Sequence, residues 1–279
     1  MSNNRKSIFL KVKDYKGNPI DEYNKISQFI KKQMCASYHS FEDAFIEYYK
    51  YCELLSGTYI DFKSCILNHT SNLLKYKEYS FNFLDKTKQD ILLNEFLDYC
   101  EIIVYVQFNV FPNIVNLYGF DRQAYSQLFG LIKTSLKSMN YEIEFINEDT
   151  NEVVVTKSNP EAEAVAAQSP KDLKEAIIYY LGTRDTNLDE KEIRLRTIID
   201  KLEPLLEKYK TQPLIKKVRE YLQLFRHPEM KKSDPQYMWF YDDKSKYLDD
   251  IFMMCIFIKE YDITKNTISE FSELKKSSE

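Results

Sequence analysis

Apolar residues recur at intervals of three and four positions along most of the chain, which is the spacing of amphipathic helices. One such stripe contains Ile198, Leu202 and Leu205. Residues 102–108 are rich in β-branched and aromatic side chains, so a buried strand is an alternative there, although helix is favoured. The pattern predicts helices at about residues 21–34, 40–57, 59–77, 87–111, 121–139, 161–168, 170–182, 187–209, 214–226 and 243–261.

Proline and serine mark several helix boundaries. The Ser-Pro-Lys-Asp stretch at 169–172 is expected to begin a helix, with Ser169 as the capping residue and proline in the first position. Pro204 is expected to kink or break the helix in which it lies. Pro228 disfavours helical geometry at the residue before it, so a helix should end near Arg226. The Lys-Ser-Glu-rich end of the chain is expected to be frayed.

A β-hairpin is predicted near the middle of the chain. Residues 141–147 and 152–157 alternate between polar and apolar positions on either side of a polar turn at 148–151. Residues 8–13 alternate in part as well, and their lysines suit pairing with Glu142 and Glu144. We therefore expect this N-terminal segment to add a third strand, because a lone hairpin is marginal in water.

The fold class predicted from these elements is mainly α, with one or more helical bundles and a small β-hairpin. Three regions follow: an N-terminal strand and helical region (1–140), the hairpin (141–157) and a C-terminal helical region (158–279). No Gly/Ser-rich linker separates the halves. One continuous domain is therefore an alternative, and if two domains exist, the hairpin marks their boundary.

Composition narrows the classes of function. The chain is 44% hydrophobic and 29% charged with a net charge of −4, which is typical of a globular protein without a general affinity for nucleic acid or anionic lipid. The N-terminus lacks a secretory signal, and the longest apolar run, 251–258, is too short to span a bilayer. We expect a cytoplasmic protein with no membrane partner. Abundant Lys, Asn and Tyr resemble the usage of AT-rich bacterial or phage genomes.

Familiar cofactor motifs are absent. The five glycines lie far apart in the sequence, which excludes the Rossmann fingerprint and the P-loop. The five cysteines form no C-x-x-C pair and are interpreted as buried free thiols in a reducing compartment. No cofactor is expected.

Metal and nucleic-acid sites are also disfavoured. His39 and His69 belong to no metal-binding motif, so no metal is expected. The acid pairs Asp242-Asp243 and Asp249-Asp250 could bind a divalent cation, but solvated charges at the start and on the polar face of a helix are the simpler interpretation. The tyrosine-rich stretch 48–51 is expected to pack in the core rather than stack on bases.

Arg226 and His227 are the one place where a guanidinium and an imidazole are adjacent. A helix, then Leu-Phe-Arg-His at 224–227, a short polar connection and an aromatic-aliphatic last helix resemble the C-terminal half of HEPN-type helical domains, which are common in abortive-infection and toxin proteins. The resemblance implies a metal-independent ribonuclease in which histidine assists attack of the 2′-hydroxyl and arginine holds the phosphate. The positions of the family's catalytic histidine hold lysine and serine here, at 231–233.

Two functions are therefore expected from the sequence. The favoured one is a non-catalytic helical interaction protein, such as a phage-defence or mobile-element component, that binds another macromolecule, with protein as the expected partner. The alternative is a HEPN-like ribonuclease or toxin that uses Arg226 and His227, acts on RNA and forms a homodimer. In a purely structural role, the same pair would complement the helix dipole at a helix C-terminus.

Overall fold

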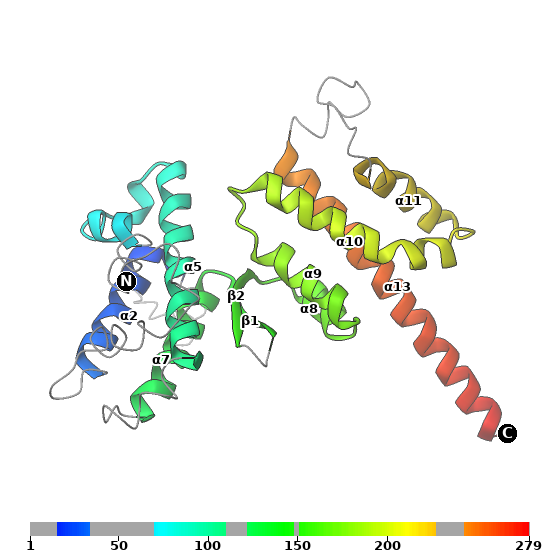
Figure 1. Ribbon diagram of the computed structural model, residues 1–279, viewed down its shortest axis with the longest axis horizontal. Coiled ribbons are helices and arrows are strands. Elements are labelled where there is room, and N and C mark those ends of the chain that lie inside the picture. Colours follow the sequence, from blue (N-terminus) through cyan, green and yellow to red (C-terminus); the bar gives the residue numbers. More distant parts are fainter. Residues whose placement is uncertain (1–15, 34–69, 110–121, 148–150, 227–242, 279) are drawn as a thin grey trace, which may run out of the picture. The chain divides into compact units, whose positions relative to one another are not determined.

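The computed structural model describes residues 16–33, 70–109, 122–147, 151–226 and 243–278 (Figure 1). The helices are α2 (Pro19–Gln33), the 3₁₀ turn η2 (Phe81–Phe83), α5 (Lys86–Asn109), α7 (Arg122–Ser138), α8 (Pro160–Ala167), α9 (Lys171–Gly182), α10 (Leu188–Lys208), α11 (Pro213–Arg226) and α13 (Lys244–Ser278). The strands are β1 (Tyr141–Asn147) and β2 (Glu152–Lys157). The predicted mainly α fold with a small hairpin is confirmed. The helix expected at 40–57 and most of that at 59–77 lie outside the described residues, but residues 70–75 are helical.

The chain divides into two compact units, residues 1–157 and 158–279. The hairpin belongs to the first unit, and the division falls directly after β2.

In the first unit, α2, α5 and α7 contact one another, and the hairpin lies against them, with β1 on α7 and β2 on α5. Ile26, Phe96 and Ile132 are fully buried where the helices meet. Ile103 and Val104 of α5 belong to the same core, so residues 102–108 are helical, as favoured, and the strand alternative is wrong. Packing of apolar side chains on a helix has overridden their local β propensity.

The hairpin is antiparallel, and Ile143 lies opposite Val155. The register is irregular between Phe145 and Asn147. The backbone N–H of Val155 donates to Oε1 of Glu101 on α5, at 2.7 Å. This N–H of β2 is therefore bonded to a helix side chain and not to a further strand. The N-terminal segment 8–13 lies outside the described residues, and the third strand stays a prediction.

Every secondary-structure element described in the second unit is a helix. α10 and α13 lie side by side, α9 and α11 both contact α10, and α8 packs on α9 and α13 (Figure 1). The core contains Leu195 and Ile198 of α10 together with Ile251, Phe252 and Cys255 of α13. Most of the aliphatic-aromatic run 251–258 therefore belongs to the interior of the unit, as its sequence predicts, although Met253 is exposed.

Two helices of this unit begin with side-chain caps. At α8, the amide oxygen of Asn159 accepts the N–H of Ala162 at 3.0 Å, and Glu163 accepts the N–H of Asn159 at 2.8 Å. This reciprocal pair resembles a capping box, with the glutamate one position further into the helix. At α10, Asn187 accepts the N–H of Glu190 at 3.3 Å.

Three expectations for this unit are wrong in detail. The N-cap of α9 is Pro170, and the hydroxyl of Ser169 instead donates backwards to the carbonyl of Val165 at 2.7 Å. Of the kink or break expected at Pro204, the break does not occur: α10 continues to Lys208, and the buried Leu206 still packs in the core beyond the proline. α13 does not fray after Tyr261 but continues as a helix to Ser278.

The core of the second unit can be tested on one helix with one residue type. Ile198→Ala should lower the free energy of unfolding by about 2–5 kcal/mol, because it removes methyl groups from a filled interior. Ile193 of α10 is 62% exposed, and Ile193→Ala should change that free energy by about 0.5 kcal/mol or less. Urea unfolding followed by circular dichroism measures both. Equal losses from the two substitutions would contradict this assignment of the α10 core face.

Candidate functional site

Arg226, one of the two predicted catalytic residues, is the last residue of α11. His227 and the lysines and serine that follow it at 231–233 lie outside the described residues. The HEPN-like site at Arg226 and His227 therefore stays a prediction.

The other residues considered for chemistry fall in different places. His39, His69 and Asp242 lie outside the described residues. Asp243 accepts the N–H of Lys246 at 3.3 Å and so caps the start of α13, which agrees with the dipole interpretation. In the described parts of the chain, no group of three or more His, Cys, Asp and Glu side chains is arranged to hold a metal ion.

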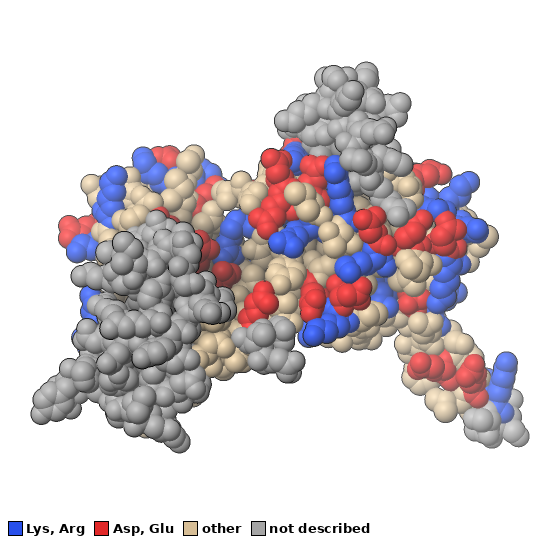
Figure 2. Space-filling model, viewed as in Figure 1, with Lys and Arg blue, Asp and Glu red and all other residues tan. Residues whose placement is uncertain are grey.

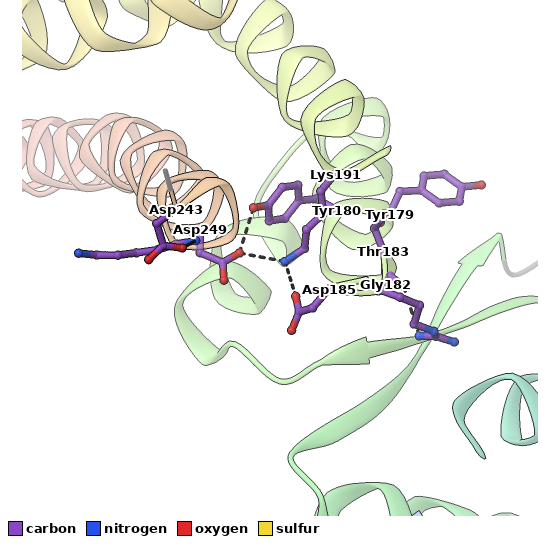
Figure 3. Close-up of polar contacts among 10 residues, drawn as sticks. Tyr179, Tyr180, Gly182, Thr183, Asp185, Lys191, Asp243 and Asp249 are labelled. Carbon is purple, nitrogen blue, oxygen red and sulfur yellow. Dashed lines mark hydrogen bonds and ion pairs between the residues drawn. The ribbon is translucent and has the colours of Figure 1, made fainter. Parts of the chain in front are cut away.

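A buried lysine forms the most concentrated polar cluster of the second unit (Figure 3). Lys191 of α10 is only 3% exposed. Its Nζ contacts Oδ1 of Asp185 at 2.6 Å and Oδ1 of Asp249 at 3.0 Å. The hydroxyl of Tyr180 donates to the same oxygen of Asp249 at 3.1 Å. The cluster thus joins α9, the α9–α10 connection, α10 and α13, and Asp249 is a paired carboxylate rather than a merely solvated one.

Aromatic packing completes this cluster. The ring of Tyr180 stacks on Phe252 with centroids 4.2 Å apart, and the Nζ of Lys191 lies 5.2 Å from the Tyr180 ring centroid. Burial, with a smaller contribution from Asp249, raises the pKa of the Tyr180 phenol. Tyr180 is therefore a neutral hydrogen-bond donor, and the cluster serves to hold helices together and keeps the ammonium charge compensated.

A second ion-pair cluster lies near the other end of the α10–α13 contact. Asp262 is 5% exposed and accepts hydrogen bonds from Nζ of Lys208 and the hydroxyl of Tyr209, both at 2.8 Å. Desolvation favours the neutral acid, but the bonds from Lys208 and Tyr209 outweigh it and hold the pKa of Asp262 below its ordinary value. Asp262 is the last buried residue of α13.

Beyond Asp262, α13 has a markedly different character. Residues 264–276 are all exposed, and in Figure 1 this end of the helix extends past α10 and α11. Ile268, Phe271 and Leu274 are 57%, 68% and 64% exposed. In an α-helix, side chains three residues apart differ in direction by about 60° around the axis. These three side chains therefore lie on the same side of α13. We call this set the α13 tail face.

This face is not among the sequence-based predictions, because the Lys-Ser-Glu-rich end was expected to be frayed. A signal was present: three large apolar residues recur at intervals of three among polar ones, which is a helical pattern. What the pattern could not show is that all three side chains are more than half exposed.

Charge is distributed without a dominant sign. Acidic and basic side chains are interspersed on the face drawn in Figure 2, including the end of α13. Cys100 and Cys255 are buried free thiols, and burial raises the pKa of Cys255, so this thiol is poorly suited to act as a nucleophile.

Comparisons with protein-family models, with curated proteins and with solved structures give no significant match. None of the described helices is long and apolar enough to cross a membrane.

Removing the carboxylates of the Lys191 cluster should lower the free energy of unfolding more than removing its lysine. The double substitution Asp185→Asn with Asp249→Asn leaves a buried ammonium without a counter-charge and should cost about 3–5 kcal/mol of unfolding free energy. Lys191→Met should cost about 1 kcal/mol or less, because the two carboxylates are 49% and 46% exposed and can be hydrated. Urea unfolding of the three proteins measures the difference. A larger loss from Lys191→Met would contradict this account.

Asp262 should contribute to acid unfolding. Its folded-state pKa lies below the ordinary value of 3.8, so its stabilisation is fully present above that pH and is lost as pH falls through the lower folded-state pKa. The parent should therefore lose more stability than Asp262→Asn when pH is lowered from neutral to below 3.8. Asp250 is exposed, and Asp250→Asn is the control that should follow the parent. Parallel pH profiles for the parent and Asp262→Asn would refute this role.

Proposed function

We propose that this chain is a non-catalytic helical interaction protein that binds a protein partner through the α13 tail face. The observation that carries the proposal is the exposure of Ile268, Phe271 and Leu274 along one side of a helix that continues well beyond its own core.

Helix energetics support a bound state for this segment. The exposed part of α13 is residues 264–276, and an isolated helix of that length has only marginal stability in water. Most helices in proteins are stabilised by packing of their apolar face. Single exposed apolar residues are ordinary, but three on one face of a projecting helix form a contiguous apolar surface. Insertion of such a face into an apolar groove is a recurrent mode of protein recognition.

The charges beside the face favour protein over nucleic acid. Lys265, Lys275 and Lys276 are accompanied by Glu270 and Glu273 in the same segment. This mixture provides no concentrated positive charge for a phosphate backbone. It suits the polar rim that surrounds the apolar centre of a protein–protein interface.

Substitution of the face should abolish capture of the partner. The triple variant Ile268→Ser, Phe271→Ser and Leu274→Ser should retain the circular dichroism and the melting temperature of the core but lose at least about tenfold in capture of a host protein, because the apolar contact is removed. The measurement is an affinity pull-down from host lysate with quantitative mass spectrometry.

The matched control changes three polar residues of the same segment, Asn266→Ser, Glu273→Ser and Lys276→Ser. A photo-crosslinker at position 271 should join the captured protein, whereas one at position 273 should not. Equal capture by both triple variants, or equal crosslinking at both positions, would overturn the proposal.

The ribonuclease alternative gives a different result. If the purified protein cuts RNA, and Arg226→Ala and His227→Ala each abolish the cutting, the non-catalytic proposal is wrong. A crosslink from position 271 to a second copy of the chain would replace the separate partner with a homodimer and would also refute the proposal as stated.

A further inference from the structure

A cavity of about 490 Å³ lies in the first unit, at the start of α2 and α5 and the end of α7. This volume falls in the range of pockets that bind small molecules. The cavity belongs to a different unit from the α13 tail face, so an inference from it is independent of the function proposed above.

The cavity is lined by three lysines and one aspartate: Lys16, Lys86, Lys137 and Asp90. Asp90 forms an ion pair with Lys86, in which its Oδ1 lies 2.7 Å from Nζ of the lysine. Among the described residues, no carboxylate pairs with Lys16 or Lys137. Two ammonium groups with uncompensated charge therefore border one cavity, which is a favourable environment for an anion.

The walls that carry these lysines are fixed by close backbone contacts. The N–H of Gly17 donates to the carbonyl of Ser138 at 3.2 Å, which ties the segment of Lys16 to that of Lys137. A Cβ at position 17 would lie 2.0 Å from Oγ of Ser138, so any larger residue there would force the Ser138 side chain to move. Asn140, with a φ of 68°, then turns the chain from α7 into β1. The two lysines are thus held on adjoining segments before any ligand binds.

The lining of the cavity also includes aromatic side chains. Phe81 of η2 lines the cavity, and its segment is held by the side chain of Gln89, whose Nε2 donates to the carbonyls of Phe81 at 3.2 Å and Leu84 at 3.0 Å. Tyr141 at the start of β1 also lines the cavity. A flat ring can therefore contact aromatic surface while an attached anion lies near the lysines.

We infer that this cavity binds a small phosphorylated ligand with a planar ring, as in a nucleotide, with the phosphates on Lys16 and Lys137 and the ring against Phe81. Such a site uses side-chain ammonium groups rather than a glycine-rich loop. It is therefore compatible with a sequence that lacks the Rossmann and P-loop motifs.

The test is isothermal titration of the full chain with three probes: ADP, pyrophosphate and adenosine. ADP should bind more tightly than either of the others, because it alone satisfies both parts of the cavity. The double variant Lys16→Gln with Lys137→Gln should bind ADP at least about tenfold more weakly, since it loses two charge-assisted contacts. Affinity of the parent for ADP should also fall as salt is raised.

The matched control is Lys31→Gln with Lys32→Gln, which removes the same charge from exposed positions near the end of α2 in the same unit. This variant should bind ADP like the parent. Phe81→Ala should weaken binding of ADP but not of pyrophosphate. Absence of ADP binding by the parent, or equal weakening by the two lysine pairs, would overturn the proposal, and equal effects of Phe81→Ala on ADP and pyrophosphate would refute the role of the ring.

Discussion

Helix α13 packs along α10, and the rest of the second unit is built around that contact. Three ion-pair groups follow it: Lys244 contacts Glu192 at 2.8 Å, Lys191 contacts Asp249 at 3.0 Å, and Lys208 contacts Asp262 at 2.8 Å. Because the start of α10 pairs with the start of α13 and the end of α10 pairs with a later part of α13, the two helices run in the same direction. Apolar burial supplies the main stabilisation, and the buried ion pairs restrict the register, since a shifted register would leave Lys191 or Asp262 without its counter-charge.

The same contact explains the exposed tail. α10 ends at Lys208, which bonds to Asp262, and beyond that contact residues 264–276 of α13 are all exposed. The helix nevertheless continues with large apolar residues on one face. The first part of α13 thus builds the core, whereas the last part provides the surface that we assign to a partner. Both parts lie on one helix, so a partner on the tail would be held by an element anchored in the core.

The first unit uses buried and half-buried carboxylates in a different way. Glu101 accepts a backbone N–H of β2, Glu95 accepts the N–H groups of Asn72 and Leu73, and Glu22, 2% exposed, accepts the hydroxyl of Ser135 at 2.6 Å. Each of these bonds joins elements that are distant in sequence and satisfies a polar group inside the unit. Near them, the close approach of Gly17 to Ser138 leaves a cavity bordered by lysines. Polar side chains therefore fix the walls of this unit as much as its apolar core does.

The sequence by itself determined most of the elements: the helical stripes, the hairpin at 141–157, the helix starts near residues 161 and 187, and the apolar character of 251–258 are local patterns whose cause lies within a few residues. At 102–108 the sequence favoured helix over strand, and tertiary packing settled that choice. Tertiary structure alone decided the passage of α10 through Pro204 and the joining of Lys191 to Asp249. It also decided the cavity beside Lys16 and Lys137, whose walls come from segments more than a hundred positions apart in the sequence. Local spacing reports which face of a segment is apolar, but which charges meet and which faces stay uncovered depend on contacts between distant segments.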